Sequence, residues 1–347
     1  MPRSETTAAR QVVDLITGTW RAQALHAAAA LSLPDHIAAG HGTVAALADH
    51  TGASEDGLAR LLRLLAALGV FTGDEEEGYG LTDVGALLVA DGEQSMRDMV
   101  LLYGEEFHRA WGAVVPAIRT GASGFEHAFG ISLHAYLRDV PDAGPRFLRA
   151  MNAGNVFFPE AAAAFDFTRA HTVVDVAGGS GLLLSAVLQA HPHLTGTVFD
   201  LPHMLPVAER HLSATVGAHR YETIAGDVFD KVPAGNDVYL LSRVLQDWDD
   251  ERCVTLLANI RAAMADTGRL LVLERVVATD GTASVLPLLW DMHLLMAAGG
   301  RERTLDGYRS VLGAAGLRLE SVHSLALETS LLVAAPVGGT PSAPALP

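Results

Sequence analysis

The spacing of apolar and polar positions divides the chain into a helical first part and a second part in which strands alternate with helices. Val12 to Leu33 is rich in Ala and Leu and predicts a helix that Pro34 closes. Glu55 to Leu68 predicts another helix, with Ser54 as its N-cap. Residues 70–82 then predict a small hairpin with an acidic tip. This order of helix, turn, helix and hairpin is typical of a winged helix.

The second part begins at His171, where short apolar runs start to alternate with helical segments. The predicted strands are 172–176, 197–200, 222–225, 237–241 and 269–274. The predicted helices are 182–189, 251–264, 286–298 and 304–315. Two β-rich segments, 317–325 and 328–335, follow and suggest an antiparallel end. This alternation predicts an α/β fold with a doubly wound, mostly parallel sheet covered by helices on both faces.

Charge decides what the winged-helix pattern can bind. Residues 41–95 contain two basic side chains, Arg60 and Arg63, against ten acidic ones. The hairpin tip, where a DNA reader needs Lys or Arg, carries four carboxylates in a row from Asp74 to Glu77. We therefore expect no nucleic-acid partner and assign this part a structural role in forming a dimer.

Three parts of the chain follow from these patterns. Residues 1–165 are expected to form a helical, winged-helix-like dimerisation domain that also provides a lid over the substrate. Residues 166–336 are expected to form the catalytic domain, and the Gly-, Pro-, Ser- and Ala-containing tail at 337–347 is expected to be disordered.

The composition favours a soluble cytoplasmic protein. The net charge is −16, which disfavours phosphate backbones as partners. Cys253 is the single cysteine, so the chain cannot form an internal disulfide, and a reducing compartment fits. The most apolar region, Val285 to Ala298, is too short and too polar to span a bilayer, so we expect no membrane partner.

A glycine-rich turn, Asp175 to Gly181, follows the first strand of the second part. Such a turn brings backbone amides and a helix N-terminus against a ligand. Asp200 lies 19 residues after Gly181, at the end of the second strand, where an acidic residue binds ribose hydroxyls. Asp227 follows the third strand and provides a carboxylate for an adenine amine.

Two features favour S-adenosylmethionine over a dinucleotide as the ligand of this turn. The dinucleotide fingerprint needs a third small residue, but Leu184 stands in that place. The turn instead approximates Asp-x-Gly-x-Gly-x-Gly, with Ala177 in place of the first glycine.

Six stretches of the chain, in their order and spacing, resemble the small-molecule O-methyltransferase family of plant caffeate-type and bacterial polyketide-tailoring enzymes. They are 174–181, 199–202, 225–227, 241–250, 271–275 and 299–304. The resemblance runs from about residue 10 to 335. It implies a class I, Rossmann-like methyltransferase of secondary metabolism, an intertwined homodimer, S-adenosylmethionine as cofactor and a small-molecule acceptor.

The resemblance also implies site residues. Those expected to bind the cofactor are Asp175, Gly179, Asp200, Leu201, Asp227, Val228, Ser242 and Trp248. Those expected to contact the acceptor are Met151, Asn155, Trp290 and His293. Those expected to take part in catalysis are Gln246, Asp247, Glu274, Glu302 and His293.

At one position the chain departs from the family. Many members carry a His that removes the acceptor's proton, but this sequence has Gln246 there. A carboxamide has no usable pKa near neutrality and cannot be a general base. Glu274 and Glu302 match the carboxylates that orient the family's His, so their usual partner is missing.

Three functions remain open after this departure. We prefer metal-assisted methylation at carbon, in which a divalent ion held by His293 with Gln246 or Asp247 chelates a 2-oxo acid. This resembles the branch of the family that methylates 2-oxo acids. The alternatives are methylation of an oxygen or nitrogen by proximity, without a base, and a tailoring reaction in which S-adenosylmethionine keeps its methyl group.

Overall fold

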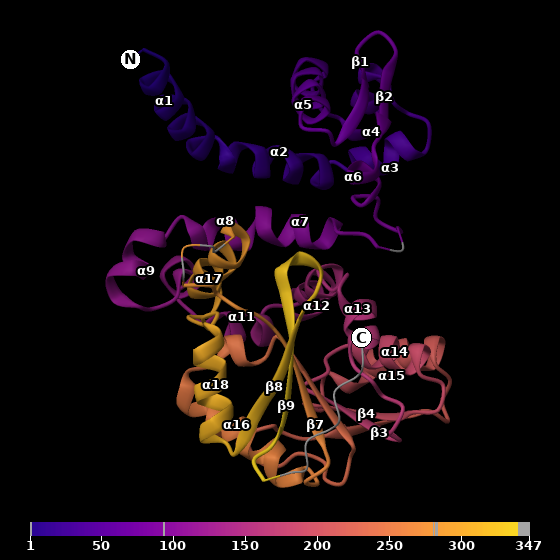
Figure 1. The fold of residues 1–347 in the computed structure, drawn as a ribbon. Helices are drawn as coiled ribbons and strands as arrows, with labels where there is room; N and C mark the ends of the chain where they lie inside the picture. Colours follow the sequence, from indigo (N-terminus) through magenta and orange to yellow (C-terminus); the bar gives the residue numbers. More distant parts are fainter. Residues whose placement is uncertain (1, 93, 280, 282–283, 339–347) are drawn as a thin grey trace. The chain divides into compact units, whose positions relative to one another are not determined.

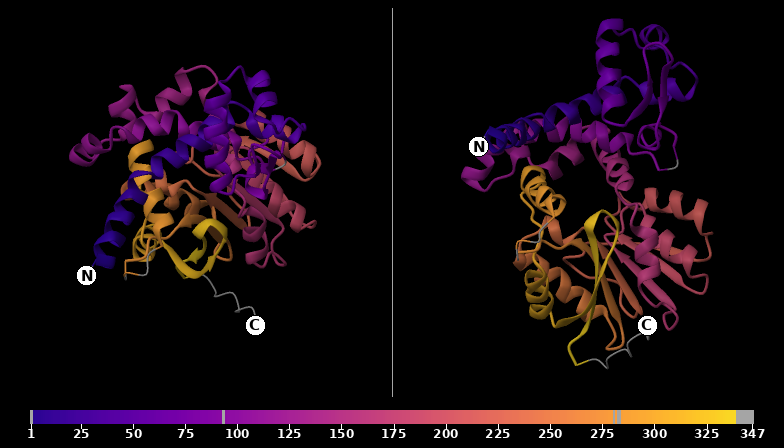
Figure 2. Two further views of the ribbon diagram at one scale, coloured as in Figure 1. Left: turned by 90° about the horizontal axis from the view of Figure 1, so that it is seen from above. Right: turned by 45° about the horizontal axis from the view of Figure 1, so that its top comes forward.

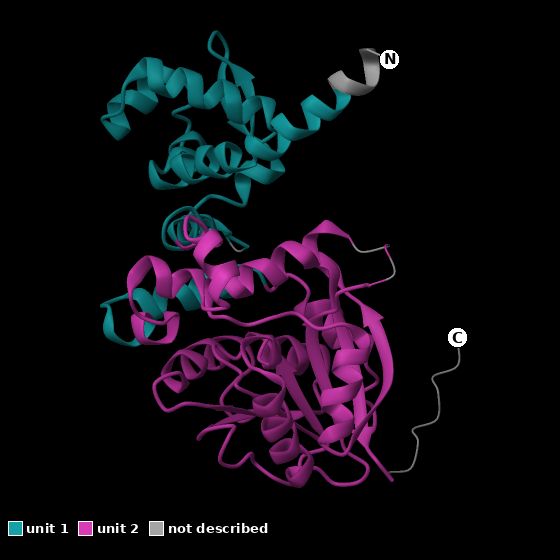
Figure 3. Ribbon diagram, turned by 90° about the vertical axis from the view of Figure 1, so that its left-hand side faces the viewer, with its two compact units in different colours: residues 1–109, 137–154 teal, residues 110–136, 155–347 magenta. Residues whose placement is uncertain are grey.

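The computed structural model describes residues 2–92, 94–279, 281 and 284–338. It divides into two compact units, one formed by residues 1–109 with 137–154 and the other by 110–136 with 155–347 (Figure 3). Each unit is described by itself below. The predicted boundary at residue 165 stays a prediction, and most of the predicted disordered tail, 339–347, lies outside the described residues.

The first unit contains a helical array and a small hairpin (Figure 1). Its hairpin pairs β1 (Phe71–Asp74) with antiparallel β2 (Gly78–Leu81), as the sequence predicted. Its helices include α1 (Pro2–Ile16), α2 (Gly18–Ala30), α3 (Leu33–Ala38), α4 (Val44–Thr51), α5 (Glu55–Ala67), α6 (Asp83–Ala86), α7 (Arg97–Gly104) and α12 (Ala143–Ala153). Two further helices, α8 (Glu106–Trp111) and α11 (Leu133–Asp139), contain residues of both units. The helices α9 (Val114–Thr120) and α10 (Gly124–Phe129) belong to the second unit.

The N-terminal helix differs from the prediction in two respects. The predicted single helix is interrupted after Ile16 and continues as α2 to Ala30. Pro34 lies in the first turn of α3 and starts a helix, whereas the sequence led us to expect that it closes one. Proline is tolerated there because the first amides of a helix have no intrahelical partner. The predicted cap at Ser54 is confirmed, since its hydroxyl accepts from the N–H of Gly57.

The second unit is built on a seven-stranded sheet with the strand order β5-β4-β3-β6-β7-β9-β8. Strands β3 to β7 pair in parallel, and β9 and β8 add an antiparallel end, as predicted. The strands are β3 (Thr172–Val176), β4 (Thr195–Asp200), β5 (Tyr221–Ala225), β6 (Val238–Ser242), β7 (Arg269–Arg275), β8 (Leu317–Ser324) and β9 (Thr329–Pro336). The hairpin of β8 and β9 is the yellow ribbon in both views of Figure 2.

Helices cover both faces of this sheet. The helices are α13 (Phe158–Ala164), α14 (Leu182–Ala190), α15 (Leu205–Thr215), α16 (Asp250–Ala263), α17 (Val285–Ala297) and α18 (Leu305–Ala314). One apolar core packs α13, α14 and α15 against one face, with Leu184 and Leu188 fully buried. A second core packs α16 and α18 against the other face, around Leu256 and Tyr308. Two-sided burial explains why the central strands read as continuous apolar runs.

The parallel strands bring the predicted ligand residues to one edge of the sheet. Asp200 ends β4, and Ser242 ends β6. The glycine turn follows β3, and Asp227 follows β5 closely. Ligands of open α/β sheets bind beside the carboxyl ends of the strands, where the strand order reverses. In the described part of the chain, no helix has the length and apolar character needed to cross a membrane.

Gly196 tests the packing of α14 on the sheet. A Cβ at Gly196 in β4 would lie 2.5 Å from Leu184 Cδ1, in a fully buried region. We expect Gly196→Ala to lower the free energy of unfolding by about 1–3 kcal/mol through overpacking.

The matched control is Gly313→Ala in α18, where a Cβ would meet nothing within 4 Å. This change should leave stability unchanged or raise it by about 0.5 kcal/mol, because Ala favours helix. Chemical denaturation of both variants checks the pair, and equal stabilities would contradict the described packing.

Candidate active site

The glycine turn after β3 is closed by hydrogen bonds to Asp200. Ala177, Gly179 and Gly181 have φ values of 55°, 57° and 74°, so the chain turns sharply in the left-handed region. The N–H of Gly179 donates to Asp200 Oδ2 at 2.7 Å, and the N–H of Leu201 donates to Oδ1 at 2.6 Å. Asp200 is only 8% exposed. The carboxylate is thus oriented at the rim of the turn, where a ribose would bind.

Asp175 lies behind the turn and is buried. A Cβ at Gly178 would lie 2.7 Å from its carboxyl carbon, so only glycine allows this close approach. Burial, together with the nearby charge of Asp200, raises the pKa of Asp175 to about 7. Its Oδ2 atom is buried without a hydrogen-bond partner in the structure as described. The prediction that Asp175 binds the cofactor directly stays a prediction.

Asp227 follows β5 and Trp248 follows β6, at the same end of the sheet as the glycine turn. Val228 comes next after Asp227. Asp227 is exposed, and its Oδ1 accepts from the N–H of Phe229 at 2.9 Å. The Phe229 ring meets Trp248 edge to face, with centroids 5.1 Å apart. The guanidinium of Arg252 lies 4.4 Å from the centroid of each ring. An oxygen acceptor beside aromatic rings suits an adenine, whose amine donates and whose faces stack.

Ser242, at the end of β6, presents a hydroxyl group that a ligand could satisfy. Its hydroxyl oxygen is buried and has no hydrogen-bond partner within the described residues. A buried hydroxyl without a partner costs free energy unless a ligand or water satisfies it. Together with Asp200 and Asp227, these groups fit a nucleoside with hydroxyl and amine groups.

The segment that carries Gln246 is fixed by Arg303. This segment contains a short helix, η1 (Leu245–Asp247). Arg303 donates to the carbonyl oxygens of Leu245 and Trp248, each at 2.7 Å, and to Asp250 Oδ1 at 2.8 Å. The carbonyl of Gln246 accepts from the N–H of Arg301 at 2.8 Å. The backbone N–H of Arg301 and the guanidinium of Arg303 therefore both bind the backbone of this segment.

Glu274, near the end of β7, binds the backbone of the same segment. Its Oε1 accepts from the N–H groups of Val244 and Leu245 at 3.0 and 2.8 Å. The residue is fully buried. Burial, with the charges of Glu302 and Asp247, raises the pKa of Glu274 well above its usual range.

Glu302 and Asp247 complete a cluster of buried carboxyl groups. Glu302 lies 3.7 Å from Arg275 Nη1, and its own N–H donates to Asp291 Oδ1 at 2.9 Å. Burial raises the pKa of Glu302 to about 7, although Arg275 opposes this shift. Burial raises the pKa of Asp247 to about 6, although a hydrogen bond from the Gln246 side chain opposes it.

His293 lies in α17 and is 7% exposed. Its Nδ1 accepts from the indole Nε1–H of Trp111 at 3.3 Å, and its ring meets Trp290 edge to face. Burial, followed by the charge of Arg275, lowers the pKa of His293 to about 4. The imidazole is therefore neutral at physiological pH.

The predicted metal ligands His293 and Gln246 are not supported. Nδ1 of His293 is occupied by an indole N–H, and the Gln246 side chain is hydrogen-bonded to Asp247. Across the described ranges, no group of three or more His, Cys, Asp or Glu residues has an arrangement that could hold a metal ion. The preference for metal-assisted chemistry is therefore not supported by the described residues.

The predicted acceptor residues are distributed over both units. Trp290 lies in the second unit, where the guanidinium of Arg275 stands 4.5 Å from its ring centroid. Asn155 follows α12, and its side-chain oxygen is buried without a partner in the described structure. Met151 belongs to α12 of the first unit. The roles of all three stay predictions.

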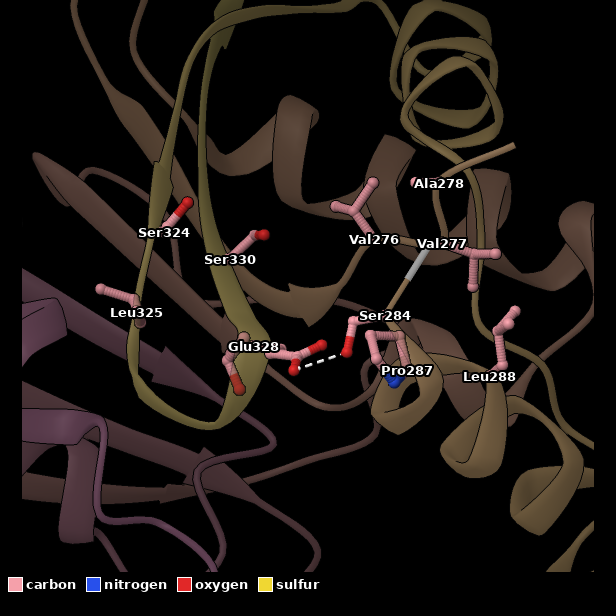
Figure 4. Close-up of a pocket in the computed structure, with 11 residues that line it drawn as sticks. Val276, Val277, Ala278, Ser284, Pro287, Leu288, Ser324, Leu325, Glu328 and Ser330 are labelled. Atoms are coloured by element: carbon pink, nitrogen blue, oxygen red, sulfur yellow. Dashed lines mark hydrogen bonds between the residues drawn. The ribbon is translucent and has the colours of Figure 1, made fainter. Parts of the chain in front are cut away.

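A separate pocket of about 270 Å³ lies between the start of α17 and the β8–β9 hairpin (Figure 4). Ser284 Oγ donates to Glu328 Oε1 at 2.7 Å there. Val276 to Ala278, which line it, directly follow Glu274 and Arg275 in sequence. None of the residues that line the pocket was predicted from the sequence as a site residue.

Sequence reasoning missed two residues that shape this site. Arg303 lies within the stretch 299–304 that carried the resemblance, but nothing in the sequence showed that its guanidinium binds two carbonyl groups. Trp111 is 182 residues away from His293, so no local pattern links them.

The sheet order, the glycine turn, the acidic residue that ends β4 and the one that follows β5 are those of a class I methyltransferase, as predicted. The O-methyltransferase domain family matches residues 111–318, and the O-methyltransferase dimerisation domain family matches residues 13–91. The chain therefore belongs to the O-methyltransferase family and is an S-adenosylmethionine-dependent methyltransferase. The resemblance seen in the sequence is confirmed.

Three relatives illustrate this membership. The 3-amino-4-hydroxybenzoate 4-O-methyltransferase of Streptomyces cremeus is 45% identical, over 94% of this chain and 90% of the relative. The phenazine-1-carboxylate N-methyltransferase of Pseudomonas aeruginosa is 42% identical, over 96% and 99%. An O-methyltransferase from neocarzinostatin biosynthesis, solved with S-adenosylmethionine and 2-hydroxy-5-methyl naphthoic acid, has a TM-score of 0.76 and 34% identity, covering 91% of this chain and 96% of that one.

Glu302 generates a prediction about stability and pH. Its pKa in the folded chain is about 7, against an ordinary value of 4.5. Between these values the unfolded chain ionises this group first, so folding stability falls as pH rises. We expect Glu302→Gln to be more stable than the wild type by about 2 kcal/mol at pH 8, and equally stable at pH 4.

Thermal and chemical unfolding across this pH range check the result. The exposed Glu251 offers a matched control, because Glu251→Gln should not change the pH dependence. A Glu302→Gln variant that loses stability most strongly at pH 8 would show that the buried group is stabilising when charged.

Proposed function

We propose that this enzyme transfers the methyl group of S-adenosylmethionine to a hydroxyl oxygen of a small aromatic acid. The reaction would serve the synthesis of a bacterial secondary metabolite. A ring or amine nitrogen is the second candidate, because one relative at 42% identity over 96% of the chain is named an N-methyltransferase.

The absence of an ionisable side chain at Gln246 carries this proposal. Gln246 cannot accept a proton, and His293 already accepts a hydrogen bond at Nδ1. A nucleophile that ionises readily by itself, such as an acidic phenol, or that carries a lone pair, such as an aromatic nitrogen, needs no protein base. Alignment with a sulfonium methyl then supplies most of the rate.

The names of the relatives support an aromatic acid as the acceptor. Both 3-amino-4-hydroxybenzoate and phenazine-1-carboxylate are aromatic rings with a carboxylate, and the structure from neocarzinostatin biosynthesis holds a naphthoic acid. These names describe transfer to oxygen or nitrogen. They support transfer to oxygen or nitrogen over methylation at the carbon of a 2-oxo acid, which the sequence led us to prefer.

The same proposal assigns cofactor-binding roles to residues at the carboxyl ends of the strands. Asp200 would accept from the ribose hydroxyls, Asp227 from the adenine amine, and Ser242 would satisfy its buried hydroxyl on the bound nucleoside. Trp248 would lie against the adenine. S-adenosylmethionine supplies an electrophilic methyl group when it is bound there.

We further propose that the chain works as a homodimer. Its dimerisation domain match covers 13–91. The helices α1 and α2 expose large apolar side chains that a second copy would cover, namely Val12, Val13, Leu15, Ile16 and Trp20.

Asp200→Ala tests the cofactor site. We expect the affinity for S-adenosylhomocysteine to fall about 100-fold, because hydrogen bonds to a charged group contribute about 1.5–3 kcal/mol each. Isothermal titration measures this change. The exposed Asp230 gives the control, since Asp230→Ala should bind like the wild type.

Product analysis tests the reaction itself. The enzyme is given S-adenosylmethionine with hydroxybenzoates, phenazine-1-carboxylate and 2-oxo acids, with and without EDTA. Mass spectrometry should locate the new methyl group on oxygen or nitrogen, with yields that EDTA does not change. A methyl group on the carbon of a 2-oxo acid, formed only without EDTA, would overturn the proposal.

A further inference from the structure

The pocket beside the start of α17 is a second candidate ligand site, and it lies wholly within the second unit. Its volume is about 270 Å³, and its walls come from residues 276–278, the start of α17 and the turn between β8 and β9 (Figure 4). This volume is close to the lower end of the range for small-molecule sites, about 300 Å³. None of the residues that we assign to the cofactor or the acceptor lines this pocket.

Apolar side chains form much of the pocket wall. They are Val276, Val277, Pro287, Leu288 and Leu325. Pro287 and Leu325 are buried, whereas Leu288 is 41% exposed and would lose contact with water beneath a ligand. Apolar surface that is removed from water contributes free energy in proportion to its area. The wall therefore favours a ligand with an apolar body.

Glu328 is the one charged residue among the described residues that line the pocket. Leu327 and Glu328 have φ values of 53° and 54°, in the left-handed region that residues with a Cβ rarely adopt. The Glu328 carboxylate meets Ser284 at the start of α17, where Ser284 Oγ donates to Oε1 at 2.7 Å. Backbone of this kind clusters at functional sites, so Glu328 is a candidate ligand group.

The charge of the pocket decides which ligands it accepts. Ser284 is the N-cap of α17, but its hydroxyl makes no cap hydrogen bond and donates to Glu328 instead. Its oxygen can therefore accept a hydrogen bond from a ligand. The N-terminus of a helix carries about half a positive charge, which is less than the full negative charge of Glu328. The net charge at the pocket is negative and selects a cation.

We propose that this pocket binds a small protonated amine with an apolar body, apart from the site of methyl transfer. The ammonium group donates to Glu328 and to the oxygen of Ser284, and the body packs against Leu288. An ammonium group has three donors, and the hydroxyl groups of Ser324 and Ser330 provide further acceptors in the lining. An aromatic acid, the acceptor class proposed above, is repelled by Glu328. The two sites therefore select ligands of opposite charge.

A fluorinated amine tests the binding. The full-length protein is saturated with S-adenosylhomocysteine, which keeps the cofactor site occupied, and 4-fluorobenzylamine is titrated by ¹⁹F NMR. We expect saturable binding in the millimolar range that weakens as salt is added, because salt screens the charge of the exposed Glu328. The uncharged 4-fluorobenzyl alcohol should bind several-fold more weakly. Equal affinities for the two probes would overturn the selection of a cation.

Variants locate the bound probe. Glu328→Gln keeps the size of the side chain and removes its charge, so the affinity should fall about fivefold and its salt dependence should disappear. Leu288→Ala should lower the affinity about threefold through lost apolar contact. Leu289→Ala is the matched control, because Leu289 is the next residue of α17, is 52% exposed and does not line the pocket. Glu251→Gln controls for the loss of one surface charge.

All four substitutions are at exposed positions, so thermal unfolding should match that of the wild type. A probe that shows no saturable binding would overturn the inference. Equal affinities in the wild type, Glu328→Gln and Leu288→Ala would also overturn it, because they would show that the amine binds elsewhere.

Discussion

The site depends on three carboxyl groups that are held close together and away from water. Asp247, Glu274 and Glu302 meet at the carboxyl ends of β6 and β7, and their pKa values are all raised. Such a cluster is costly when fully charged, because the interior screens like charges poorly. Hydrogen bonds from backbone amides to Glu274 and the nearby cation of Arg275 offset part of this cost. Through Glu274 the cluster binds the backbone of the segment that carries Gln246.

This arrangement explains how the family's site can function without its histidine. The carboxyl groups that would orient a His remain, and one of them, Glu274, accepts hydrogen bonds from the backbone of the Gln246 segment. The imidazole of His293 is neutral and accepts from Trp111. Under the proposed function neither Gln246 nor His293 acts as the base, which suits a nucleophile that ionises by itself.

Much of this fold was predictable because it follows from local patterns. Two-sided burial gave continuous apolar runs for the parallel strands, and the spacing from Gly181 to Asp200 predicted the carboxylate that closes the glycine turn. Gln246 was recognisable as a departure from the family because the residues on either side of it, in the stretch 241–250, match the family's pattern. The rest depends on contacts between distant parts of the chain. The hydrogen bond from Trp111 to His293 joins residues 182 positions apart, and no residue type predicts it.

The central claim is that no side chain of the protein takes the acceptor's proton. It is tested by the pH dependence of kcat/KM for a series of ring-substituted hydroxybenzoates whose hydroxyl groups differ in acidity. The account predicts that the pH of half-maximal kcat/KM moves with the acidity of each acceptor. A single midpoint shared by all the acceptors would reveal a base in the protein and contradict the account.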